Sequence, residues 1–181
     1  MGADGPDEQR LLAALVEELM KKSDLCWLRL PGADRDRVVW HIWHEGAAYV
    51  VSGGSEQPAP GLESVDSVTV VVRAKDSRQR MLAWRAEVST VLPGTPEWDS
   101  AVPALVSGRL NLRDLDTAAQ RWAEECTVSR LTPSGVVEEQ PGAMPDADHA
   151  APPLPTPATT RLRLPRVLHR RQTRRPNLRS D

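Results

Sequence analysis

The chain has 181 residues, a net charge of −2 and 16 prolines, but only two cysteines, Cys26 and Cys126. No segment is long and apolar enough to span a bilayer, and the N-terminus lacks the charged and apolar regions of a secretory signal. We therefore expect a cytoplasmic protein without membrane contact. Two lone cysteines beside six tryptophans indicate buried thiols in a reducing compartment rather than a disulfide.

The composition changes near residue 140. Residues 141–181 hold eight prolines and eight arginines but only three acidic residues, a net charge of +5, whereas residues 1–140 carry −7. We predict one folded domain, residues 1–140, and a disordered Pro/Arg-rich tail, residues 141–181, which cannot bury enough apolar surface to fold. Such a tail favours weak contact with nucleic acid or an acidic partner, and the alternative is an appendage without function.

The folded part begins with a predicted amphipathic helix. Pro6 suits the first turn of a helix, and acidic residues follow it at the positive end of the helix dipole. Apolar residues then recur at helical spacing: Leu11, Leu12, Leu15, Val16 and Leu19. A short strand at residues 25–30 comes next and ends at Pro31 and Gly32.

The next stretch predicts a β-hairpin followed by an unusual loop. Residues 38–43 and 49–51 are β-branched and aromatic, and Glu45 with Gly46 between them is a typical hairpin turn. The loop at residues 52–61 reads Ser-Gly-Gly-Ser-Glu-Gln-Pro-Ala-Pro-Gly. Its glycines leave backbone N–H groups able to face a ligand, although a plain turn remains the alternative.

Two further strands are expected at residues 67–75 and 81–91. In the first, valines alternate with Thr69, Val71, Arg73 and Lys75. Arg73 and Lys75 share one face about 7 Å apart, near enough to hold one phosphate. The alternative is a solvated strand end paired with a nearby aspartate.

The remaining elements are two helices and a last strand. Thr95 and Pro96 begin a helix that Pro103 should kink or split. Residues 117–125 predict a short helix with Trp122 inward, and residues 127–132 a strand. About six closely spaced antiparallel strands with flanking helices predict a mainly β protein built as a small barrel.

His41 and His44 are the only histidines of residues 1–140. Residues three apart in a strand point to opposite faces, so the two cannot chelate one ion, and we expect no metal site. A single haem-ligating histidine is the alternative.

Several ordered motifs carry a resemblance to a known family. They are WHIWHEGAAYVVSGG, GSEQPAPGL, VVVRAKD, RMLAWRAEV and PGTPEW. With the leading helix, residues 8–134 resemble the pyridoxamine 5′-phosphate oxidase-like, FMN-binding split β-barrels, and more narrowly a short actinobacterial branch of them.

The resemblance implies a homodimer with flavin at the subunit interface. By this likeness the phosphate would be held by the loop residues Ser52, Gly53, Gly54 and Ser55 and by the strand bases Arg73 and Lys75. An acceptor would lie near Trp43 or Trp84, although Trp43 also suits a core or dimer interface. Glu56 and Gln57 are either ring-edge hydrogen-bonding groups or exposed loop residues.

Two functions follow as hypotheses. The first is an FMN- or deazaflavin-binding protein, acting as an oxidoreductase on a small molecule. The alternative is a non-enzymatic split-barrel module that binds a small molecule or a partner and has lost the cofactor. The second hypothesis is motivated by residues 55–58, Ser-Glu-Gln-Pro, where flavin-binding members often have a Ser/Thr-x-Lys pattern.

Overall fold

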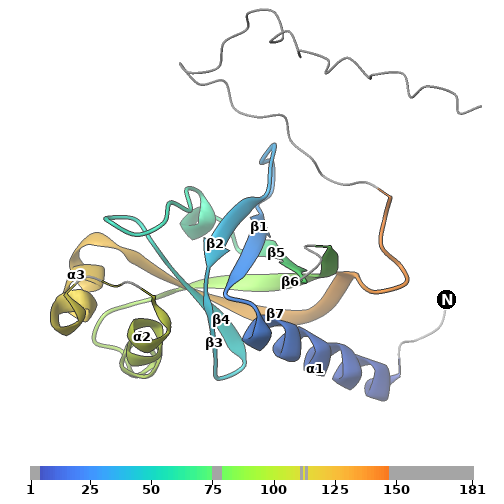
Figure 1. Cartoon of the computed structure of the whole chain (residues 1–181), viewed down its shortest axis with the longest axis horizontal. Helices are drawn as coiled ribbons and strands as arrows, with labels where there is room; N and C mark the ends of the chain where they lie inside the picture. The colour runs from blue at the N-terminus through green and yellow to red at the C-terminus, as the bar shows by residue number, and fades with distance from the viewer. Residues whose placement is uncertain (1–4, 75–78, 111, 113, 147–181) are drawn as a thin grey trace, which may run out of the picture. The chain divides into compact units, whose positions relative to one another are not determined.

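Seven antiparallel strands form one curled sheet in the order β2-β1-β5-β6-β7-β4-β3 (Figure 1). The computed structural model describes residues 5–74, 79–110, 112 and 114–146, so Lys75 and the tail from residue 147 lie outside it. The strands are β1 Leu25–Arg29, β2 Arg37–Trp40, β3 Ile42–His44, β4 Ala47–Ser52, β5 Ser67–Arg73, β6 Arg80–Val91 and β7 Thr127–Glu139.

The sheet is curled because its two edge strands are consecutive in the chain. β2 and β3 lie at opposite ends of the strand order, yet only His41 separates them. The first and last strands must therefore meet at this residue. This arrangement confirms the predicted split β-barrel, with seven strands among the described residues where about six were expected.

The prediction that residues 38–43 form one strand, the first arm of the hairpin, was wrong. β2 pairs with β1, and β3 pairs with β4. At the break, the His41 N–H donates to the Asp24 carbonyl at 3.3 Å, outside both ladders. The turn itself is confirmed, since Glu45 and Gly46 have φ of 45° and 77°, as a tight type I′ hairpin turn requires.

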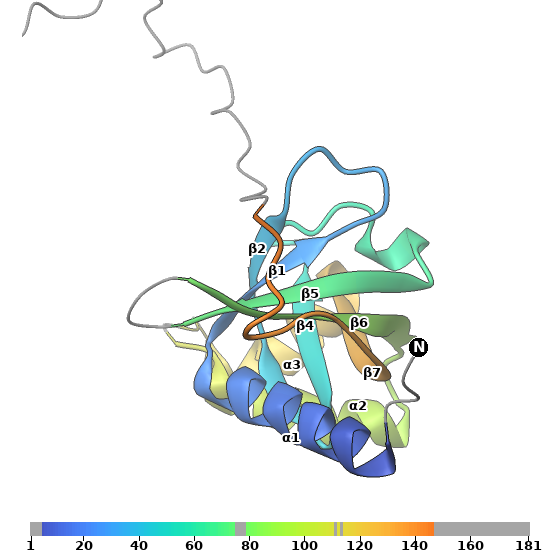
Figure 2. The ribbon, with the colours of Figure 1, turned by 90° about the vertical axis from the view of Figure 1, so that its right-hand side faces the viewer.

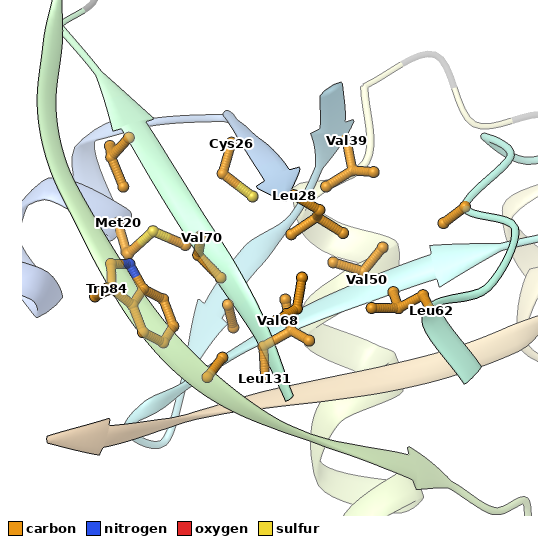
Figure 3. Packing of buried hydrophobic residues seen from close by; sticks show 14 of the residues in the cluster. Met20, Cys26, Leu28, Val39, Val50, Leu62, Val68, Val70, Trp84 and Leu131 are labelled. Carbon is orange, nitrogen blue, oxygen red and sulfur yellow. The ribbon is translucent and has the colours of Figure 1, made fainter. Parts of the chain in front are cut away.

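Alternate side chains of the strands face the inside of the barrel and form its core. Leu28, Val50, Val70, Trp84 and Leu131 are each 1 % exposed or less (Figure 3). Helix α1 (Pro6–Lys22) adds Val16 and Met20 to this cluster and contacts β3 and β7 (Figure 2). The amphipathic helix predicted from leucine spacing is thus confirmed.

A second core lies on the outer face of the sheet, beneath two helices. Helices α2 (Pro96–Gly108) and α3 (Ala118–Glu125) pack there against the outward side chains of β4 and β7. Trp122 is fully buried in this core, as predicted. β4 is buried along its whole length because one face meets each core.

Two details of the C-terminal half bear on the predictions. Of the two outcomes predicted for Pro103, a kink or a split, the split does not occur, because α2 continues through this exposed residue. The last strand runs to Glu139 rather than to residue 132. Its extension is irregular, because β6 and β7 shift register between Trp84 and Ala86. No helix in the described ranges has the length and apolar content that crossing a bilayer requires.

Candidate functional site

The outer face of β1, β2 and β5 carries a cluster of aromatic, apolar and basic side chains. β1 and β2 pair Leu25 with Trp40 and Trp27 with Val38. β1 and β5 pair Trp27 with Val71, which places Arg73 level with Leu25. We call Leu25, Trp27, Val38, Trp40 and Arg73 the tryptophan–arginine patch. Leu25 is 45 % and Val38 49 % exposed, so its centre is open and apolar.

Two guanidinium groups lie over the two indoles of this region. The Arg73 guanidinium carbon is 4.8 Å from the Trp27 ring centroid, and that of Arg109 is 5.0 Å from Trp40. Both distances suit a cation–π contact. By the spacing of two neighbouring strands, Arg73 and Trp40 are roughly 10 Å apart across Leu25.

The two arginines differ in their electrostatic partners. Arg109 donates its Nε to Glu56 at 3.2 Å. Arg73 forms no ion pair with any residue of the described ranges, whereas Arg29, Arg80 and Arg85 on the same sheet pair with Asp36, Glu138 or Glu139. Among the described residues, no carboxylate neutralises the Arg73 guanidinium.

Two buried donors of the patch lack acceptors in the described part of the chain. They are the Nε of Arg73 and the indole Nε1 of Trp40. A buried polar group without a partner costs free energy, and most such groups in proteins are paired. Both atoms are enclosed by neighbouring side chains, so the exposed part of the Arg73 guanidinium is the part that a ligand on the patch can reach.

The predicted glycine loop is folded into a closed turn beside the patch. The Gly53 N–H donates to the Gln57 carbonyl at 3.2 Å, and the Glu56 N–H donates to the Gly53 carbonyl at 2.9 Å. Ser52 is buried, while Gly53, Gly54 and Ser55 are exposed. Within the described residues, the N–H groups of Gly54, Ser55 and Gln57 in this turn have no hydrogen-bond partner, and Gly54 and Ser55 are the exposed residues among them. Gly54 and Ser55 are therefore the loop's candidate donors.

Gly54 holds this loop against the junction of α3 and β7. A Cβ at Gly54 would lie 3.0 Å from the Glu125 Cβ and 3.1 Å from the Cys126 Sγ, and its φ is +52°. A larger residue would push the loop away from this junction. Burial, and then the carboxylates of Glu56 and Glu125, raise the pKa of the Cys126 thiol, while Arg121 acts in the opposite direction.

Glu56 and Gln57 are not exposed loop residues. The Glu56 side chain is 3 % exposed and accepts hydrogen bonds from Arg109 and from the Trp122 indole, the latter at 3.1 Å. The Gln57 amide accepts from the Trp40 N–H at 2.6 Å and donates to the Trp40 carbonyl at 2.8 Å and the Val51 carbonyl at 3.1 Å. Through Gln57, the loop borders the patch at Trp40.

The predicted site residues thus fall into two groups. Arg73 belongs to the outer patch, and the loop at residues 52–55 is joined to the patch only through Gln57 and Trp40, whereas Trp43 and Trp84 belong to the barrel core on the other face. Their rings are 6.3 Å apart in an edge-to-face arrangement, and Trp84 is 1 % exposed. Lys75 lies outside the described residues.

Sequence reasoning missed the role of Trp27 and Trp40. Alternation within residues 25–30 places Leu25 and Trp27 on one face, a signal available from the sequence. The neighbourhood of Trp40 depends on the β1–β2 pairing, which the assumed hairpin concealed.

The two described histidines each use one ring nitrogen in a contact within the protein. His41 is 5 % exposed with its Nε2 3.2 Å from the Met20 carbonyl, and burial lowers its pKa to about 4. The Nε2 of His44 lies 2.8 Å from the Ser100 hydroxyl. Both Nε2 atoms are therefore engaged. The described ranges contain no group of three or more His, Cys, Asp or Glu residues that could hold a metal ion.

No protein-family model matches the chain, and no curated protein matches it in sequence. Among solved structures, the haem storage protein HutZ from Vibrio cholerae matches 68 % of this chain and 91 % of its own, with 16 % identity and a TM-score of 0.50. A putative pyridoxamine 5′-phosphate oxidase from Listeria innocua matches 68 % of this chain and 94 % of its own, with 12 % identity and a TM-score of 0.47. A FAD-binding protein from Mesorhizobium loti matches 67 % of this chain and 87 % of its own, with 12 % identity and a TM-score of 0.46. The likeness is one of fold.

Proposed function

From the split-barrel fold that this chain shares with these proteins, we propose that it binds a flavin-type cofactor, FMN or a deazaflavin, at the tryptophan–arginine patch. The observation that carries the proposal is Arg73. Its guanidinium lies over Trp27 without an acidic partner in the described ranges, and its buried Nε lacks an acceptor. A planar ring bearing an anionic group is the ligand that such a surface complements.

Each residue of the patch has a separate part in this proposal. Arg73 would hold the phosphate as a charge-assisted donor. The N–H groups of Gly54 and Ser55 lie beyond Trp40, so they would serve a different polar group of the ligand. The apolar strip of Leu25 and Val38 would support the ring system.

The proposed activity is that of an oxidoreductase of the pyridoxamine 5′-phosphate oxidase-like type. A bound flavin would supply the hydride-transfer chemistry, and the protein would bind and orient its ring. The five patch side chains include no carboxylate or imidazole that could act as a general acid or base. Their contribution is therefore restricted to positioning, charge and exclusion of water.

We test the proposal with Arg73→Ala. Wild-type protein should quench FMN fluorescence on binding, and the variant should bind FMN at least about tenfold more weakly, a loss of about 1.4 kcal/mol. Riboflavin lacks the phosphate, so its affinity should change much less. The matched control is Arg85→Ala, which removes an outer-face arginine already paired with Glu138 at 2.6 Å.

A non-enzymatic split-barrel module is the second candidate. It is favoured by the closed loop, whose Gly53 and Glu56 N–H groups are used within the turn, and by the neighbouring carboxylates of Glu56 and Glu125. Wild-type protein that is purified without flavin colour and binds neither FMN nor a deazaflavin would favour this candidate and refute the first.

A further inference from the structure

A pocket separate from the tryptophan–arginine patch lies between α1 and β7. Its volume is about 310 Å³. Leu12, Ala13 and Val16 of α1 line one side, and Pro133 to Val137 of β7 line the other, with Trp84 of β6 between them. Figure 2 shows α1 lying along the barrel next to β7.

The pocket exists because β7 bulges at this point. Ala86 pairs with Pro133 and Trp84 pairs with Val137, so one intervening residue of β6 faces three of β7. At the centre of the bulge Gly135 has a φ of +83°, and a Cβ there would meet nothing within 4 Å. Bulges of this kind are over-represented beside functional sites, because they redirect a strand locally.

The lining indicates the chemistry of the ligand. None of its ten residues carries a charge, and the only side-chain polar groups apart from the indole are those of Gln9 and Ser134. The Ser134 hydroxyl is already used, since it donates to the Arg85 carbonyl at 3.0 Å and accepts from the Val136 N–H at 3.4 Å. An anion would therefore find no counter-charge here.

We propose that this pocket binds a small neutral aromatic molecule of one or two rings. The molecule would lie between the Trp84 indole and the side of α1 that carries Leu12 and Val16. Ligand pockets in proteins begin at about 300 Å³, which suits a molecule of this size. The exposed Gln9 amide at the rim can hydrogen-bond a ligand hydroxyl or amine, and the buried Trp84 indole Nε1 is a second lining donor without a partner among the described residues. The site does not depend on flavin binding, because it shares no residue with the patch.

Prodan, 6-propionyl-2-(dimethylamino)naphthalene, is a neutral two-ring dye whose emission shifts in apolar surroundings, and it tests the proposal on the full chain. Wild-type protein should bind one dye per chain with saturation. Ala13→Phe fills the pocket from an exposed helix position and should weaken dye binding at least tenfold. Ala14→Phe, also exposed and next in the helix but not part of the lining, is the control and should bind as wild type does.

Charge selectivity is tested by competition. 1-Naphthol should displace the dye at concentrations at least tenfold lower than 1-naphthalenesulfonate does. Absence of saturable dye binding to wild-type protein would overturn the proposal, as would equal binding by the folded Ala13→Phe and Ala14→Phe proteins. Equal displacement by the two naphthalenes would overturn the assignment to a neutral ligand. Arg73→Ala should leave dye binding unchanged, so this test and the flavin test can fail separately.

Discussion

His41 is a titratable side chain enclosed at the junction of two strands. Burial lowers its pKa to about 4, so the folded protein takes up a proton there only near that pH. The unfolded chain takes one up from about pH 6.5, the ordinary value for histidine. The contribution of neutral His41 to stability is therefore fully present above about pH 6.5. It is lost as the pH falls from about 6.5 to about 4, by about 3 kcal/mol in total.

Urea unfolding at a series of pH values from 7 to 4 measures this loss. His41→Gln should flatten the profile over the window, although it lowers stability at pH 7 by weakening the contact with the Met20 carbonyl. His44→Gln is the matched control, because His44 is partly exposed and its replacement should leave the slope in place. A wild-type slope equal to that of His41→Gln would contradict the assignment.

At the scale of elements, the Gln57 amide joins the edge strand β2 to the end of β4. It substitutes for a neighbouring strand by satisfying both the N–H and the carbonyl of Trp40. Gln57→Leu leaves these backbone groups without partners and should destabilise the protein by about 2 kcal/mol, measured as the free energy of unfolding in urea. Gln120→Leu, at an exposed position of α3, should change it by much less. Equal effects of the two substitutions would show that the Gln57 amide does not hold β2 to the end of β4.

How far the sequence predicts each element depends on how local its signal is. The α1 pattern and the turn at Glu45 and Gly46 are local, and both were predicted. The break at His41 was not, because the surrounding residues are uninterrupted β-formers and the change of partner is set by the distant β1. Pro133 and Gly135 resemble a turn, which concealed the extension of β7 through a bulge.

The candidate site likewise contains residues that a local sequence signal indicates and residues that only the pairing of distant strands brings together. Strand alternation indicated the outward face of Arg73, and the resemblance indicated the loop at residues 52–55. Trp43 and Trp84 were expected beside them, but they face the barrel interior because alternation within β3 and β6 turns them inward. Trp27 and Trp40 become part of the site only through strand pairing, which a single sequence does not specify.

At the scale of the whole molecule, the half-exposed Leu25 and Val38 lead us to propose a homodimer that buries the patch. Val38→Asp would place a charge in that apolar contact and should raise the dimer dissociation constant at least about tenfold, or about 1.4 kcal/mol. Sedimentation equilibrium measures this constant. Leu92→Asp, at a 60 % exposed position outside the patch, should leave the dimer intact. Wild-type protein that sediments as a monomer at micromolar concentration would contradict the proposal.

The single-residue link between β2 and β3 also affects the tendency of the protein to aggregate. An open sheet has two bare edges, each a template onto which another chain can add a strand and begin an aggregate. Here both edges converge on one residue, each is only three or four residues long, and a glutamine side chain occupies part of one of them. The topology that closes the barrel therefore also leaves little unpaired strand edge to which a strand of another chain could add.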